Sequence, residues 1–208
     1  MAATLDKSLE DWSQTVPLSC SYSMERIEKD YRPKWMWALL DGAGSPQYSH
    51  IYPSRLTELM WRLSWTTRLI LNQALLHTLD VLQGMSSTAT LSDMIHPEVI
   101  QINLLLMIDR LCESCLAPFT NASQNNPPPS AIGDIHSLRG YALLQPLPII
   151  DLCLDQVQII GVDFSVKKEW IGKMLGFLWM QIGLAKAKAV IEPHRIESLP
   201  VQLWGLAE

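Results

Sequence analysis

The sequence predicts an all-α fold, and three observations predict it. Apolar residues recur with the period of a helix over three long stretches, at about 55–83, 97–116 and 165–192. Alternation typical of a strand is not sustained anywhere in the chain. Helix boundary signals flank the patterns, namely Ser54 as a cap, Pro97 in a first turn and Pro193 after an end.

The length predicts a single domain. The chain has 208 residues, of which 48% are hydrophobic and 18% charged, and it contains eight Trp and nine Met. A chain of this length can bury a large core without disulfides or metal. We expect residues 1–54 to form an N-terminal cover of short helices, residues 55–192 the helical core, and residues 193–208 a C-terminal tail.

The predicted helix at 55–83 is apolar on two sides. We expect its core face to hold Leu56, Leu59, Met60, Leu63, Ile70, Ala74 and Val81. The opposite side carries Trp61, Trp65, Arg68, Asn72, Leu76 and Leu79. A narrow strip of Arg62, Thr66, Gln73 and Asp80 lies between them and is expected to face water. The pattern is typical of a central helix.

The other two long helices have clearer boundaries. The helix at 97–116 should end before Pro118 and bury Gln101, Leu104, Leu105, Ile108, Leu111, Cys112 and Cys115. The helix at 165–192 should be capped by Asp163 or Ser165. Its Gly172, Gly176 and Gly183 share a face, which predicts the close approach of another backbone and permits a homodimer.

A proline-rich segment separates the last two long helices. Pro127 to Pro129 forbid regular structure, and the loop at 121–139 is either a lid or disordered. The run from Leu143 to Leu154 is too apolar for a solvated loop, which predicts a short buried helix.

Charge and cysteine content exclude several classes of function. The net charge is -5, and the sequence contains no cluster of Lys and Arg. Direct binding of nucleic acid is therefore not expected. No apolar run reaches the length of a membrane span, and the N-terminus has no signal-peptide core. The four scattered cysteines suit an intracellular, reducing compartment, cytoplasmic or, for a regulator, nuclear. Cys112 and Cys115 have CxxC spacing, but we interpret them as core residues.

The first candidate site is an aromatic slot. Trp61, Trp65, Arg68 and Asn72 could hold a planar ligand, with the Arg and Asn binding a phenolate or enolate oxygen. The alternative is packing against the N-terminal segment, with Arg68 paired to Asp109, Asp151 or Asp155.

The second set of candidates consists of groups that could move protons. His77 is either a core histidine or a proton shuttle. The acid-base candidates are Asp109, Glu113, His136, Tyr141 and Asp151, of which Asp151 is the carboxylate we expect to be buried. No phosphate loop, dinucleotide fingerprint or metal-binding helix motif occurs, so we expect no cofactor and no metal.

Four segments resemble the regulatory domain of fungal-specific transcription factors of the binuclear zinc-cluster class. They are RLSWTTRLILNQALL, IDRLCESCLAPF, LRGYALLQPLPIIDLC and EWIGKMLGFLWMQIGLAKAKAVIE, and the resemblance covers about residues 56 to 192. Gln145 stands where that family often has Trp, and the cysteine-rich DNA-binding cluster is missing. The resemblance implies a helical effector domain. Because the DNA-binding cluster is missing, we expect the domain to stand alone, and from that truncation we infer that it could act on a small metabolite.

Two functions remain open from the sequence. The first is a cofactor-independent enzyme of secondary metabolism that cyclises an aromatic or polyketide-type metabolite, with Arg68, His77, Asp109 and Asp151 as catalytic groups. Trp61, Trp65, Asn72 and Tyr141 would then bind the substrate. The alternative is a non-catalytic ligand sensor or transcription-regulatory module that partners a DNA-binding factor.

Overall fold

The computed structural model describes residues 1–28, 32–84, 96–120, 140–157, 159 and 162–191. Its longer helices are α1 (Ala2–Thr15), α3 (Arg55–Gly84), α5 (Pro97–Thr120), α7 (Pro146–Gln156), α8 (Ser165–Met180) and α9 (Ala185–Ile191). Shorter elements are η1 (Leu18–Cys20), η3 (Lys34–Met36), α2 (Trp37–Leu40), β1 (Ser23–Arg26) and β2 (Tyr48–Ile51). The all-α class is confirmed, and the part of the chain that is described adds one two-stranded sheet.

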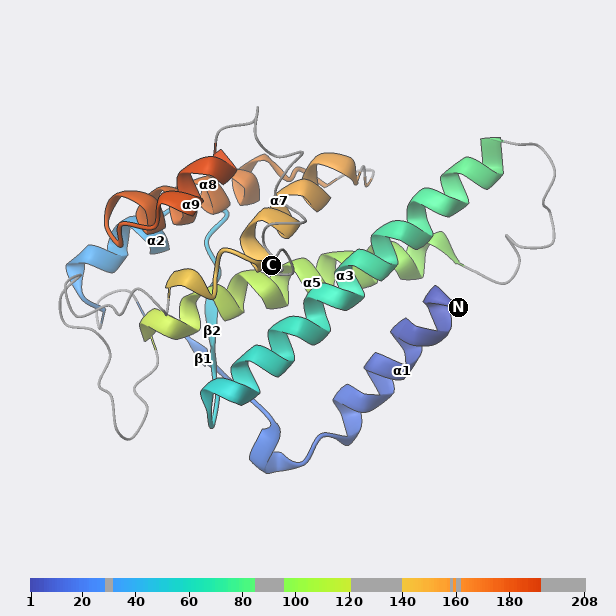
Figure 1. Ribbon diagram of the computed structural model, residues 1–208, viewed down its shortest axis with the longest axis horizontal. Helices are drawn as coiled ribbons and strands as arrows, with labels where there is room; N and C mark the ends of the chain where they lie inside the picture. Colours follow the sequence, from blue (N-terminus) through green and yellow to red (C-terminus); the bar gives the residue numbers. More distant parts are fainter. Residues whose placement is uncertain (29–31, 85–95, 121–139, 158, 160–161, 192–208) are drawn as a thin grey trace, which may run out of the picture.

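Two long helices form the centre of the fold. α3 and α5 pack together and run in opposite directions, with α1 beside α3 and with α7 and α8 on the other side of the pair (Figure 1). Buried leucine and isoleucine side chains fill the space between these helices, among them Leu69, Leu104, Ile108, Leu111 and Ile150. α8 joins this core through Trp170, whose indole N–H donates to the carbonyl oxygen of Leu39 at 2.8 Å. Ser54 caps α3 as predicted, since its hydroxyl accepts the Thr57 amide at 3.1 Å.

The predicted orientation of the central helix was wrong. The expected core face of α3 points outward, and the large apolar side chains Leu56, Leu59, Met60, Leu63, Ile70 and Val81 are 38% to 68% exposed. The side that carries Trp61 and Trp65 is buried instead. Arg62 and Thr66, expected in water, are also buried. A helix with two apolar sides gives no periodicity signal that distinguishes its inner side.

The end of α5 was also predicted wrongly, because the helix continues through Pro118 to Thr120. A proline has no amide hydrogen, so the carbonyl oxygen of Ser114 loses its normal helical partner. The guanidinium of Arg62 takes that place and donates to this oxygen at 2.6 Å. The same contact explains why a cation of α3 is buried against α5.

The predicted helix at 165–192 is two helices. α8 ends at Met180, and Gly183 has a φ of +76°, a conformation that L side chains rarely adopt. The chain then turns into α9. The predicted close approach at the glycine face is not observed among the described residues, since a Cβ on Gly172 would meet nothing within 4 Å. The close approach occurs at Gly44 instead, where a Cβ would lie 1.9 Å from the carbonyl oxygen of Val166.

The remaining predictions concern the N-terminal cover and the middle of the chain. The short buried helix is confirmed as α7. The N-terminal segment contains the 14-residue helix α1 and an antiparallel hairpin in which Ser23 pairs with Ile51 and Arg26 with Tyr48. The hairpin was not predicted. The proline-rich loop at 121–139 and the tail at 193–208 lie outside the described residues.

Candidate functional site

The predicted aromatic slot is filled by side chains of the N-terminal segment. The Trp61 ring centroid lies 5.2 Å from that of Trp12 and 4.9 Å from that of Tyr22. The ring of Tyr22 also packs edge-on against Trp65 at 5.2 Å. The Trp61 indole N–H donates to the carbonyl oxygen of Cys20 at 2.9 Å. Both Trp side chains therefore anchor the N-terminal segment to α3.

Arg68 and Asn72 bind a carboxylate, but one that the sequence did not single out. Asp6 of α1 accepts a hydrogen bond from Arg68 Nε at 2.8 Å and another from Asn72 Nδ2 at 2.9 Å. Arg68 Nη2 lies 3.4 Å from the second oxygen of Asp6. All three side chains are buried. The predicted partners Asp109, Asp151 and Asp155 are not used, and this polar cluster joins α1 to α3.

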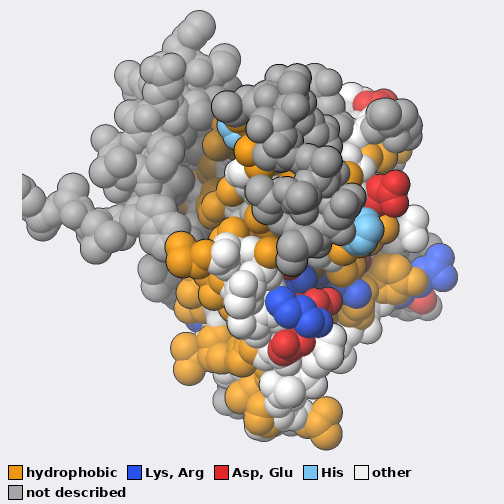
Figure 2. Space-filling model, turned by 90° about the vertical axis from the view of Figure 1, so that its right-hand side faces the viewer, with side chains coloured by type: hydrophobic (Ala, Val, Ile, Leu, Met, Phe, Trp, Pro, Cys, Tyr) orange, Lys and Arg blue, Asp and Glu red, His pale blue; other side chains and the backbone are white. Residues whose placement is uncertain are grey.

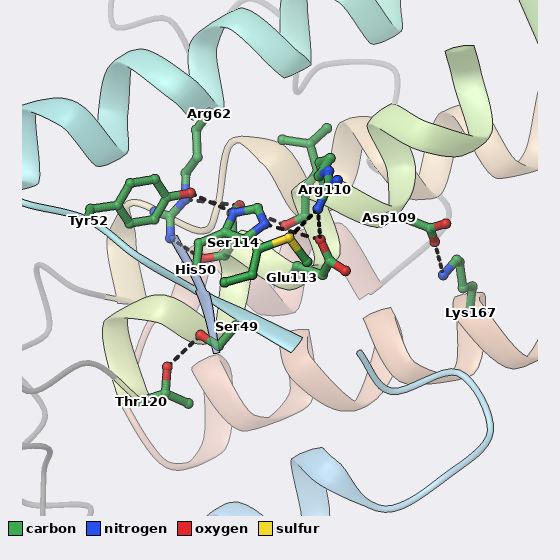
Figure 3. Close-up of polar contacts among 12 residues, drawn as sticks. Ser49, His50, Tyr52, Arg62, Asp109, Arg110, Glu113, Ser114, Thr120 and Lys167 are labelled. Atoms are coloured by element: carbon green, nitrogen blue, oxygen red, sulfur yellow. Dashed lines mark hydrogen bonds and ion pairs between the residues drawn. The ribbon is translucent and has the colours of Figure 1, made fainter. Parts of the chain in front are cut away.

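A second buried polar cluster surrounds His50 of β2 (Figure 3). His50 Nδ1 lies 2.9 Å from the Tyr52 hydroxyl, and His50 Nε2 lies 3.1 Å from Oε2 of Glu113 on α5. Arg110 Nη1 donates to the same Glu113 oxygen at 3.2 Å. A neutral imidazole satisfies these contacts when Tyr52 donates to Nδ1 and Nε2–H donates to Glu113.

The titration behaviour of the His50 cluster follows from its burial. Burial lowers the pKa of His50 below its ordinary value of 6.5, although the hydrogen bond to Glu113 acts in the opposite direction. The ring centroid of Tyr22 lies 4.4 Å from that of His50, and burial raises the pKa values of Tyr22 and Tyr52 above 10. The cluster is therefore a neutral histidine between a protonated phenol and a carboxylate. It joins the hairpin to α5, and its imidazole is fully enclosed.

Arg62 belongs to the same region of the core. Its Nε and Nη2 bond Ser114, and Nη2 also pairs with Glu58 at 2.6 Å. Nη1 is buried with no hydrogen-bond partner within the described structure. Figure 3 also shows the hydroxyls of Ser49 on β2 and Thr120 on α5, which are 2.6 Å apart. These bonds attach α3 and the hairpin to the last turns of α5.

The remaining acid-base candidates lie in separate environments. Asp109 is exposed and pairs with Lys167 of α8. The exposed Tyr141 hydroxyl accepts a hydrogen bond from Lys186 at 3.2 Å. Asp151 of α7 is half-buried; burial raises its pKa above 3.8, while Lys168 opposes this shift. Glu113 belongs to the His50 cluster, and His136 lies outside the described residues.

The candidate ligand site is a groove that contains His77. It lies between the C-terminal half of α3 and the end of α7 and has a volume of about 670 Å³. Its lining residues are Ile70, Gln73, Ala74, Leu76, His77, Thr78, Asp80, Gln156 and Val157. A hydrogen bond from Gln73 to Gln156 connects the two walls. Of the eight predicted site residues, His77 alone is among those that line this groove.

The surface of the molecule mixes apolar and polar side chains. Figure 2 shows one face of the molecule, on which hydrophobic side chains reach the surface beside small groups of charged ones.

None of the described helices combines the length and the hydropathy that a membrane span needs. Within the described ranges, no group of three or more His, Cys, Asp or Glu side chains could hold a metal ion.

Comparison with known proteins identified no relative of this chain. No family model, no characterised protein and no solved structure matches the chain. The resemblance to the fungal regulatory domain therefore stays a prediction.

Sequence reasoning missed the residues that organise the two buried clusters. Asp6 and His50 are each paired with a residue more than 60 positions away, so no local pattern in the sequence connects them to their partners. The sequence did indicate that a partner such as Asp6 was needed. Arg68 and Asn72 lie one helical turn apart on an apolar face, and two such buried donors require a buried acceptor.

Proposed function

We propose that this chain is a helical small-molecule-binding module whose ligand lies in the groove beside His77. The observation that carries the proposal is the groove itself, since its volume of about 670 Å³ lies in the usual range of ligand sites. Its walls combine apolar groups with amide, hydroxyl, imidazole and carboxylate groups. Such a lining can bind an organic molecule and fix its orientation.

The polar groups of the groove favour an aromatic or polyketide-type ligand that carries hydroxyl and carbonyl groups. The hydrogen bond between the two glutamines uses an amide hydrogen of Gln73 and the carbonyl oxygen of Gln156. Gln73 Oε1 can accept a hydrogen bond from a ligand hydroxyl, and Gln156 Nε2 can donate one to a ligand carbonyl. Ile70 and Val157 supply apolar contacts for a planar ring.

Binding without turnover is the form of this function that the geometry supports best. Arg68 is engaged by Asp6, and Asp109 by Lys167, so neither guanidinium nor carboxylate is directed to the groove. Of the four predicted catalytic groups, a ligand there would meet His77, and it would also meet Asp80, which was not among them. A sensor or regulatory module also agrees with the family resemblance of the sequence.

A cofactor-independent cyclase is the second candidate. His77 and Asp80 both line the groove, one helical turn apart on α3. A neutral imidazole could remove a proton from a phenol or enol, and the groove would hold the reactant in a reactive conformation. This function requires catalytic turnover, which a sensor does not show.

Equilibrium dialysis against a panel of hydroxylated naphthalenes and anthraquinones tests the proposal. We expect saturable binding of one ligand per chain, weakened about tenfold by His77→Ala or Gln156→Ala, the effect of losing about one hydrogen bond. His96→Ala is the matched control, because His96 is exposed and does not line the groove. Binding that both groove variants leave unchanged would place the ligand elsewhere, and no binding would refute the function for this class of ligand.

A further inference from the structure

The outward side of α3 is an apolar surface that the other described helices and strands leave exposed. We define the α3 outer face by Leu56, Leu59, Met60, Leu63, Thr67 and Ile70. Its five large apolar side chains are each at least 38% exposed. Isolated exposed leucines are ordinary, but a contiguous row along one helix marks an interaction surface.

The spacing of this row is that of a helix-pairing seam. Leu56, Leu63 and Ile70 are seven residues apart, and so are Met60 and Thr67. Two series offset by four residues form the apolar seam through which one helix packs along another. From Leu56 to Ile70 the seam is about 21 Å long, at 1.5 Å per residue. The partner that fits it is another α-helix.

The distribution of charged residues on this part of α3 is compatible with an identical partner. The charged residues between Leu56 and Ile70 are Glu58, Arg62 and Arg68. Both arginines are buried on the inner side, where they pair with Glu58 and Asp6 respectively. The outer face itself contains no charged residue. Two copies brought together through it would meet no like charges.

The area is also adequate for a pair of identical faces. Five large apolar side chains that are about half exposed offer on the order of 400 Å², comparable to the largest patch on a typical monomer. Two such faces, with their polar margins, approach the roughly 1,000 Å² that a specific interface requires. One face against a polar surface would bury much less apolar area.

We propose that the α3 outer face binds a second copy of this chain. The two α3 helices pack antiparallel around a twofold axis near Leu63, so that each copy contributes the same surface. Helices packed through such seams cross at about 20° and diverge on both sides of the contact. Ile70 belongs both to the α3 outer face and to the groove, so the seam ends where the groove begins. The mass of the protein tests the dimer and equilibrium dialysis tests the ligand function, so either proposal can fail while the other holds.

Light scattering coupled to size-exclusion chromatography tests this proposal on the full chain, from micromolar to hundreds of micromolar protein. We expect a mass near twice 23.5 kDa for the wild type. Leu63→Glu should weaken self-association at least about a hundredfold, because two buried carboxylates would face each other. Ile102→Glu on α5 is the control, since Ile102 is 63% exposed and lies outside the face.

Circular dichroism establishes that each variant is folded, and Leu56→Glu provides a second disruption should Leu63→Glu unfold. A wild-type mass of 23.5 kDa at every concentration would overturn the proposal and assign the face to another segment or partner. A dimer that persists in both leucine variants would equally overturn it, because the interface would then lie elsewhere.

Discussion

Removing the Asp6 carboxylate should destabilise the fold strongly, although Asp6 lies in the first half of the peripheral helix α1. In Asp6→Ala, Arg68 and Asn72 keep their buried positions but lose the acceptor that they share at 2.8 and 2.9 Å. Breaking a buried ion pair on one side costs about 3–5 kcal/mol. Because α1 can separate from α3 and let water reach Arg68, we expect the lower end, about 3 kcal/mol.

Urea denaturation followed by circular dichroism at 222 nm, a standard helix wavelength, measures this loss. With a slope of about 2–3 kcal/mol/M, the midpoint should fall by about 1–1.5 M. Asp11→Ala on the same helix is the control, since Asp11 is exposed and pairs with the exposed Lys7 at 3.2 Å, and it should cost below about 1 kcal/mol.

A double substitution separates the charge effect from the packing effect. Asp6→Leu combined with Arg68→Met replaces the pair by apolar groups and should recover most of the stability, because no buried charge remains. Asn72 keeps its bond to the backbone oxygen of residue 68. Equal stabilities of Asp6→Ala and Asp11→Ala would refute the argument that this cluster anchors α1.

Three further predictions concern titratable groups. Because burial lowers the pKa of His50, the unfolded chain binds more protons just below pH 6.5, so stability should fall as the pH drops through this window. His50→Gln should reduce that slope in urea titrations, and an unchanged slope would contradict the assignment. Burial raises the pKa of Asp151, so its charge destabilises the fold above that pKa; Asp151→Asn should stabilise the protein at pH 7, with the gain vanishing toward pH 3.8. A gain that does not change with pH would exclude this cause. Of the four cysteines, Cys20 is half-buried, while burial raises the pKa values of the other three, to about 12 for Cys115 and Cys153. A thiol-reactive dye should therefore label one cysteine rapidly in the native state and four in denaturant, and more than one rapid label would contradict the buried placement.

The sequence identified most helices because local signals mark their ends. The Ser54 cap, the Pro97 first turn and the apolar run of α7 each depend on residues within a few positions. The break at Gly183 was missed because a glycine within an apolar periodic pattern is compatible with a continuous helix. The hairpin was missed because its two strands are short and pair across more than 20 residues.

The inner side of α3 could not be predicted from periodicity. Both sides of this helix are apolar, and the choice between them depends on tertiary partners of polar residues. Arg62 is buried because Pro118 leaves the Ser114 carbonyl oxygen without its helical donor. Arg68 is buried because Asp6 lies opposite it. Neither partner is recognisable before the helices are in place.

The same limit applies to the candidate site. The sequence placed Trp61, Trp65, Arg68 and Asn72 on one face of a helix, and all four are buried. The two Trp rings contact each other, and Arg68 and Asn72 bind the same carboxylate. It could not indicate that Trp12, Tyr22 and Asp6 occupy the space in front of them. Of the proposed catalytic groups, His77 lines the groove.

Binding without turnover in the His77 groove is the central claim, and the stoichiometry of ligand depletion tests it most directly. A small amount of the protein is incubated with a mixed extract of aromatic and polyketide-type metabolites, and each compound is followed by liquid chromatography and mass spectrometry. We expect that one compound is depleted up to the amount of protein, is recovered unchanged on denaturation, and is not depleted by His77→Ala. Conversion of a compound in large excess over the protein would contradict it and establish an enzyme.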